Sequence, residues 1–120
     1  MDQQHILLVE DDMNLGFLLM EFLEMEGLQV TWRKDGRSAM QELQKQAFDL
    51  AVLDVMMPGM DGIETCDQIR KTAGLEGTLI AFLTARGEDY SQVAGFDAGA
   101  DDYITKPFSY IQFLARIQAI

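Results

Sequence analysis

A chain of 120 residues, 48% of them apolar, has the length and composition of one domain with a single buried core. Its formal net charge of −11 argues against nucleic-acid binding by the domain itself, because neutralising phosphates requires lysine and arginine. The single cysteine excludes an internal disulfide, and without a membrane-spanning apolar run or a secretory signal we expect a cytoplasmic protein.

Apolar strands and helical patterns alternate along the chain. We expect strands over 5–9, 28–33, 48–54, 78–83 and 101–105, and helices over 13–26, 36–46, 62–72, 88–98 and 109–120. This alternation predicts an α/β domain with helices on both faces of a parallel sheet. The leading fold is flavodoxin-like, (βα)5, with five strands in the order 2-1-3-4-5. We expect this one domain to span 1–120 and any effector domain to lie beyond it.

Two helices carry apolar stripes that predict their inner faces. The stripes of helix 13–26 are Leu18, Phe22 and Met25 on one side, and Leu15, Leu19 and Leu23 on the other. A surface helix needs only one stripe, so the second is either extra burial against a neighbouring helix or a docking surface. In the last helix we expect Ile111, Leu114 and Ile117 to face inward.

Polar residues follow four of the predicted strands. These strand ends carry Glu10-Asp11-Asp12, Asp54, Thr84 and Lys106. The carboxyl ends of parallel strands meet at one edge of the sheet, where open α/β folds bind their ligands, and the order 2-1-3-4-5 places the strands ending at Glu10 and Asp54 side by side. Chance would scatter these residue types, so the four strand ends indicate one site.

The site suits phosphoryl transfer to a carboxylate. Crowded carboxylates repel one another and therefore hold a proton or bind a hard cation, and an all-oxygen ligand set matches Mg²⁺. Asp54 is then the nucleophile, Lys106 an ion-pair partner of the phosphate, and Thr84 a hydrogen-bond donor to it. The structural alternatives are that Asp11 or Asp12 caps the first helix and that Lys106 and Thr84 are turn residues.

Over essentially its whole length, the chain resembles the receiver domain of two-component response regulators, and four segments carry the resemblance. They are Val9 to Asp12, Leu53 to Gly62, Leu83-Thr84-Ala85, and Gly99 to Phe108. The runs Lys106-Pro107-Phe108-Ser109 and Leu114-Ala115-Arg116-Ile117 resemble the subgroup that carries a C-terminal winged-helix DNA-binding domain.

The resemblance implies that Asp54 accepts the phosphoryl group from the phosphohistidine of a histidine kinase or phosphotransfer protein. The implied ligands of Mg²⁺ are Asp11, Asp12, Asp54 and the Met56 main-chain carbonyl. Thr84 and Tyr103 are the implied switch residues, and Lys106 pairs with the phosphoryl group. The alternative for Tyr103 is an edge aromatic that is half-buried.

Two protein interfaces are also implied. The kinase-docking positions are Leu15, Gly16, Leu19, Pro107 and Phe108, and the positions on the homodimer face are Gln92, Asp97, Asp101, Gln112 and Arg116. Gln92 and Gln112 stand where a basic and an acidic partner are usual in the subgroup, so one ion pair of the dimer becomes an amide pair.

The resulting hypothesis is a phosphorylation-switched signalling module that regulates transcription through an output domain and turns over no external substrate. The alternatives are a stand-alone receiver or phosphorelay intermediate, and a metal-dependent phosphohydrolase with an aspartyl nucleophile. Against the phosphohydrolase, Met56 stands where a second acid is usual, and no cap insertion is present. A nucleotide- or flavin-binding module lacks support because no glycine-rich loop follows the first strand.

Overall fold

The computed structural model describes residues 4–55, 61–85, 99–106 and 110–119. The strands β1 (His5–Val9), β2 (Gln29–Arg33), β3 (Leu50–Asp54), β4 (Leu79–Ala85) and β5 (Asp102–Lys106) form one parallel sheet. Their order is β2-β1-β3-β4-β5, which confirms the predicted topology. The predicted helix over 88–98 lies outside the described residues.

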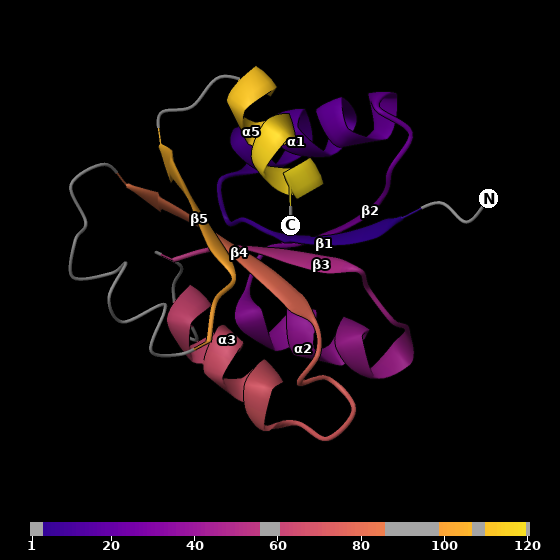
Figure 1. Cartoon of the computed structure of the whole chain (residues 1–120), viewed down its shortest axis with the longest axis vertical. Coiled ribbons are helices and arrows are strands. Elements are labelled where there is room, and N and C mark those ends of the chain that lie inside the picture. Colours follow the sequence, from indigo (N-terminus) through magenta and orange to yellow (C-terminus); the bar gives the residue numbers. More distant parts are fainter. Residues whose placement is uncertain (1–3, 56–60, 86–98, 107–109, 120) are drawn as a thin grey trace.

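The described helices are α1 (Met13–Met25), α2 (Gly36–Lys45), α3 (Gly62–Lys71) and α5 (Tyr110–Ala119). Helices α1 and α5 cover one face of the sheet, and α2 and α3 cover the other (Figure 1). None of these helices combines the length and apolar character needed to cross a membrane.

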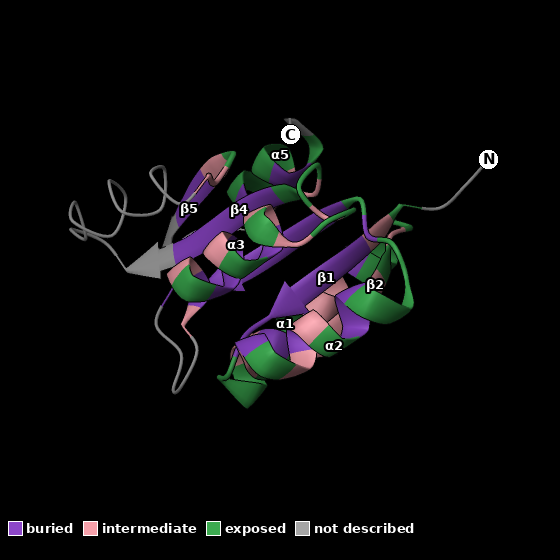
Figure 2. Ribbon diagram, turned by 90° about the horizontal axis from the view of Figure 1, so that it is seen from below, coloured by how far each residue is buried: buried purple, intermediate pink, exposed green. Residues whose placement is uncertain are grey.

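The core has two layers, one on each face of the sheet. Every residue of β3 is buried, as its uninterrupted apolar run predicts for a central strand, and β2 at the edge is only partly buried. Figure 2 shows the central strands in purple between helices whose outer surfaces are largely green. The sheet therefore holds the carboxyl ends of its strands in fixed positions relative to one another.

The inner faces of α1 and α5 differ in part from the predicted ones. In α1 the buried stripe contains Leu19 and Leu23, whereas Leu18 is 49% exposed and Met25 is 84% exposed. In α5 the prediction that Ile111 faces inward is wrong, because that residue is 80% exposed. Among the described side chains of α5, Ile117 is buried as predicted, and Phe113 is buried in place of Ile111. These two residues lie on one face of the helix because they are four residues apart.

The single cysteine, Cys66, is fully buried between α3 and the sheet. Burial raises the pKa of its thiol to about 11. We expect a colorimetric disulfide reagent at pH 8 to label the native chain at least about a hundredfold more slowly than the unfolded chain, since the thiolate is the reactive species. The measurement compares labelling rates in buffer and in urea, and equal rates would contradict the buried position.

Candidate functional site

Three acids meet at the carboxyl edge of the sheet, at the ends of β1 and β3. Carboxylate oxygens of Glu10, Asp11 and Asp54 all lie within 4.8 Å of one another. The register explains the meeting, because Val9 pairs with Leu53 and the acids follow these residues in their strands. Glu10 and Asp54 are buried and Asp11 is exposed, so the acid cluster opens to solvent on one side.

Glu10 takes a place in this cluster that sequence reasoning assigned to Asp12. The Asp12 carboxylate caps α1, with its Oδ1 accepting from the main-chain N–H groups of Asn14 at 3.0 Å and Leu15 at 3.1 Å. Asp12 is exposed, and its Oδ1 is engaged by the N-terminus of the helix, as is usual for an aspartate at this position. The signal that identifies Glu10 is its position directly after Val9, which matches that of Asp54 after Leu53.

The cluster fits a hard divalent cation such as Mg²⁺. Its donors are oxygen atoms only, and the charges of buried Glu10 and Asp54 and of exposed Asp11 are held close together. Each pair of such carboxylates repels by roughly 1–4 kcal/mol at contact, depending on the local dielectric, and a cation offsets this repulsion. The Met56 carbonyl, the fourth ligand that the resemblance implies, lies outside the described residues.

The start of α3 lies directly against the backbone at the end of β3. The Gly62 N–H donates to the Val55 carbonyl at 3.1 Å, and a Cβ on Gly62 would lie 2.3 Å from the Asp54 carbonyl oxygen. Asp61 caps α3 by accepting from the Glu64 N–H at 2.8 Å. The glycine therefore allows α3 to begin in direct contact with the strand end that carries Asp54.

The backbone positions of Thr84 and Lys106 lie at the same edge. Asp54 pairs with Leu83, directly before Thr84, and Ala85 at the end of β4 pairs with Lys106. The side chains of Thr84 and Lys106 lie outside the described residues, so their contacts with the acid cluster stay a prediction. Tyr103 is buried rather than half-buried, with its ring centroid 5.4 Å from that of Phe82.

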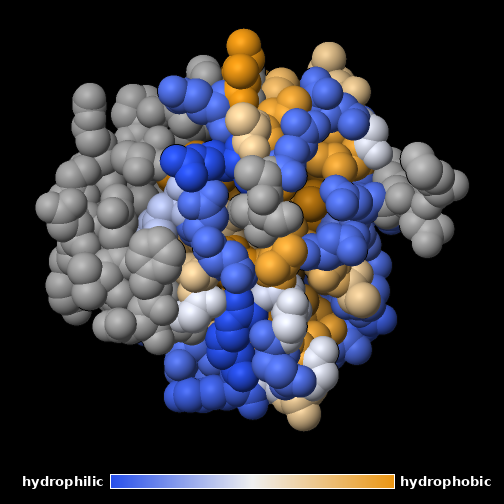
Figure 3. Space-filling model, viewed as in Figure 1, coloured by the Kyte–Doolittle hydropathy of each residue, from blue (hydrophilic) through white to orange (hydrophobic). Residues whose placement is uncertain are grey.

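Burial narrows the predicted docking surface on α1. Gly16 and Leu19 are buried and Leu15 is partly buried, so the first two offer no exposed surface to a partner. The exposed apolar residues in the first half of α1 are Met13, Phe17 and Leu18. Figure 3 shows hydrophobic residues interspersed with hydrophilic ones in the upper part of the view, where α1 and α5 lie in Figure 1. Pro107 and Phe108 lie outside the described residues.

Two residues of the predicted dimer face, Asp101 and Arg116, form ion pairs within the chain. Asp101 pairs with Arg70 of α3 at 3.0 Å and also accepts from the Ile80 N–H at 2.8 Å, whereas Arg116 lies 3.4 Å from Asp102. Asp102 is thus the acid beside Arg116. Sequence reasoning did not include it, because the two adjacent aspartates differ only in their tertiary contacts. Gln112 is exposed, and Gln92 and Asp97 lie outside the described residues.

A five-stranded parallel sheet in this strand order defines a flavodoxin-like α/β domain, and the acid cluster at its switch point could hold a hard cation. Residues 6–118 match the family described as the response regulator receiver domain. The chain belongs to this family.

Similar proteins agree with this assignment. The chain is 43% identical over 115 residues to the regulatory protein VanRc of Enterococcus gallinarum, and 47% identical over 115 residues to the transcriptional regulatory protein CpxR of Escherichia coli, covering 96% of this chain and 48% of each relative. The chain thus spans about half the length of the curated relatives it matches. The crystal structure of a putative response regulator from Chloroflexus aurantiacus superposes with a TM-score of 0.94 at 32% identity, covering 98% of this chain and 97% of that one.

Proposed function

We propose that this receiver domain is a phosphorylation switch in which Asp54 accepts a phosphoryl group from a histidine kinase in a Mg²⁺-dependent reaction. The observation that carries the proposal is the acid cluster, in which a buried strand-end carboxylate lies within 4.8 Å of Glu10 and Asp11. Carboxylates held this close to one another repel, and a bound cation would offset that repulsion, so a cation-dependent role accounts for their proximity better than a structural one.

In the proposed reaction an Asp54 oxygen forms a bond to phosphorus while the bond from phosphorus to the donor imidazole breaks. The buried end of β3 holds Asp54 in place, and Glu10 and Asp11 would hold the cation beside it. Mg²⁺ would supply positive charge that offsets both the carboxylates and the phosphoryl oxygens. The N–H groups at the end of β4 and the Lys106 ammonium are the further groups that we assign to the phosphoryl oxygens.

The wider role is proposed from the relatives. VanRc is named a regulatory protein and CpxR a transcriptional regulatory protein, and both are about twice as long as this chain. We therefore propose that the protein is cytoplasmic and that an output domain outside 1–120 regulates transcription. The proposed phosphoryl donor is a sensor histidine kinase or a phosphotransfer protein. Phosphorylation would favour a homodimer through the face containing Asp102 and Arg116, and the domain would act on no external substrate.

Labelling with a small-molecule phosphodonor tests the phosphorylation. With acetyl phosphate and Mg²⁺ we expect one phosphoryl group per chain, attached as an acyl phosphate that hydroxylamine removes, and no labelling in a chelator. Intact-protein mass spectrometry measures the labelled fraction. Continuous phosphate release from a phosphomonoester would instead support the phosphohydrolase, and labelling that is independent of the cation would contradict the proposed site.

The α1 surface gives a separate prediction for the kinase interface. The substitution Leu18→Asp places a charge on an exposed apolar position and is expected to slow phosphotransfer from the cognate kinase about tenfold or more, as for a central interface residue. Labelling by acetyl phosphate should not change, because Leu18 is not part of the acid cluster. The matched control is Met25→Asp, because Met25 is an exposed apolar residue at the other end of α1. Equal loss with both donors would contradict docking at Leu18.

A further inference from the structure

We propose that Trp32 is a positioning residue for the acid cluster, and that its indole N–H, by holding the main chain of Glu10, strengthens Mg²⁺ binding. The inference rests on the proposed function, because it concerns the same cation site. Trp32 lies on the edge strand β2 and contributes no ligand atom to the cluster.

Both main-chain polar groups of Glu10 are held by consecutive residues of β2. The Trp32 indole Nε1–H donates to the Glu10 carbonyl at 2.9 Å, and the Glu10 N–H donates to the Arg33 carbonyl at 3.0 Å. Glu10 lies one residue beyond the end of β1, where the last ladder pair joins Val9 to Arg33. The indole therefore extends the attachment of the acid turn to β2 past the point where backbone pairing ends.

The same turn continues into α1 through hydrogen bonds of its acids. A Glu10 side-chain oxygen accepts from the Asp12 N–H at 3.1 Å, and Asp12 in turn caps α1. Asp11, between them, is the exposed member of the cluster. Fixing the Glu10 carbonyl thus limits the rotation of the peptide between Glu10 and Asp11, the two acids that would bind the cation with Asp54. Ligands that are already held in place lose less conformational entropy when the cation binds.

The indole ring is itself held in place by α1. A Cβ on Gly16 would lie 2.3 Å from two ring carbons of Trp32, so the glycine leaves the space that the ring fills. Trp32 also packs against the core layer that contains Leu8 and Leu19. The donor that reaches Glu10 therefore comes from a ring whose position is determined by packing on two elements.

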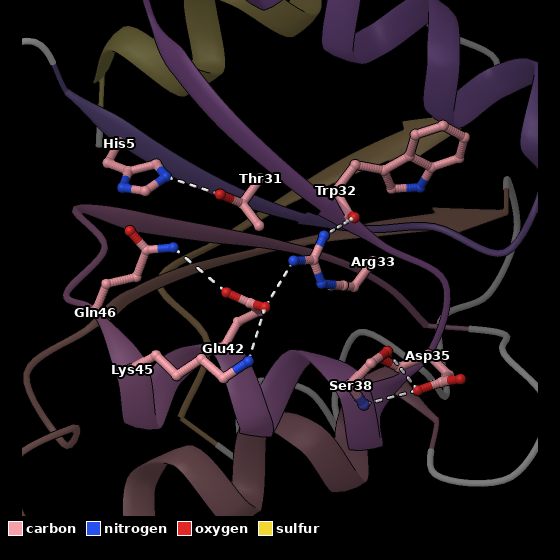
Figure 4. A network of polar contacts seen from close by, with 9 residues as sticks. All are labelled: His5, Thr31, Trp32, Arg33, Asp35, Ser38, Glu42, Lys45 and Gln46. Carbon is pink, nitrogen blue, oxygen red and sulfur yellow. Dashed lines mark hydrogen bonds and ion pairs between the residues drawn. The ribbon is translucent and has the colours of Figure 1, made fainter.

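A polar network on the opposite side anchors the β2 main chain at the same residues. The Arg33 guanidinium donates to the Trp32 carbonyl at 2.7 Å and to Glu42 of α2 at 2.6 Å (Figure 4). The hydrogen bond from Arg33 holds the pKa of the Glu42 carboxyl below its usual range. The end of β2 is thus tied to both helical layers where it supports Glu10.

Titration calorimetry with Mg²⁺ on the full chain and on Trp32→Phe tests the role of the N–H. Phenylalanine keeps an aromatic ring but has no donor, and we expect the dissociation constant to rise about tenfold, the lower end of the effect of outer-shell partners of metal ligands. The matched control is Thr31→Val at the residue before Trp32. This substitution removes the 2.9 Å contact between the Thr31 hydroxyl and the ring of His5, the first residue of β1. We expect this variant to bind Mg²⁺ like the original chain.

Fluorescence provides a second measurement that a merely structural role would not change. Trp32 is the only tryptophan of the chain, so its emission should shift as Mg²⁺ is added, with a midpoint equal to the calorimetric dissociation constant. Equal Mg²⁺ affinity in Trp32→Phe and the original chain, or emission that does not respond at saturating Mg²⁺, overturns the role of Trp32 alone. Absence of Mg²⁺ binding to the original chain overturns the proposed function as well. If Trp32→Phe fails to fold, the emission titration of the original chain decides whether Trp32 responds to Mg²⁺.

Discussion

Replacing Asp54 with asparagine is expected to abolish labelling by acetyl phosphate. The amide in Asp54→Asn is close in shape to the carboxylate, so the buried end of β3 should keep its packing, but the nucleophilic oxygen pair is lost. The variant also removes one charge from the acid cluster. In the absence of Mg²⁺ we therefore expect its free energy of unfolding to exceed that of the original chain by about 1 kcal/mol, and its unfolding temperature to be higher.

The control for this variant is Asp67→Asn. Asp67 forms a 2.9 Å ion pair with Lys71 on the exposed side of α3, and such pairs contribute little to stability. We expect it to be labelled like the original chain and to be stabilised by Mg²⁺ to the same extent, whereas Asp54→Asn should gain little from Mg²⁺. Mass spectrometry and thermal unfolding with and without the cation measure both effects. Undiminished labelling of Asp54→Asn would place the phosphoryl group on another residue.

The second large effect is expected from Gly62→Ala. The added Cβ would lie 2.3 Å from the Asp54 carbonyl oxygen and 2.9 Å from its carbonyl carbon, and neither backbone atom can rotate away as a side chain would. The start of α3 or the end of β3 must move, so we expect the free energy of unfolding to fall by about 3 kcal/mol, as for severe overpacking. Labelling of Asp54 should slow as well, because its backbone moves.

Gly77→Ala is the matched control for this substitution. Gly77 lies in the turn before β4 with no atom within 4 Å of an added Cβ, so the same chemical change meets open space. We expect its stability to be unchanged or slightly raised, since alanine restricts the unfolded chain more than glycine does. Urea unfolding and acetyl phosphate labelling of both variants measure the difference. Equal stability of the two variants would show that the contact at Gly62 is not a constraint.

Most of the fold was predictable because its signals are local. The apolar run from Leu50 to Leu53 predicts a central strand, and the structure confirms burial at each of its residues. The predicted β4 ends too early, since the strand runs to Ala85 through pairing of Thr84 with Thr105. That extension depends on the neighbouring strand rather than on the sequence of β4 itself.

The chemical type of the site was also predictable, because strand ends in a parallel sheet meet at one edge. Which acids meet there was not. Asp12 and Glu10 are two residues apart, yet one caps α1 and the other joins Asp54. Asp101 and Asp102 diverge in the same way, toward Arg70 and Arg116.

The sequence by itself determined the alternation of strands and helices and the presence of acids at the strand ends, since hydrophobic periodicity and strand ends are properties of short segments. The order of the sheet was predicted from the fold that this alternation favours, and the tertiary structure confirmed it. Only the tertiary structure decided which carboxylates share the cluster, which face of α1 is exposed, and that Trp32 supports Glu10. These outcomes depend on distances of a few ångströms between elements far apart in the chain, and such distances are set by how the whole core packs.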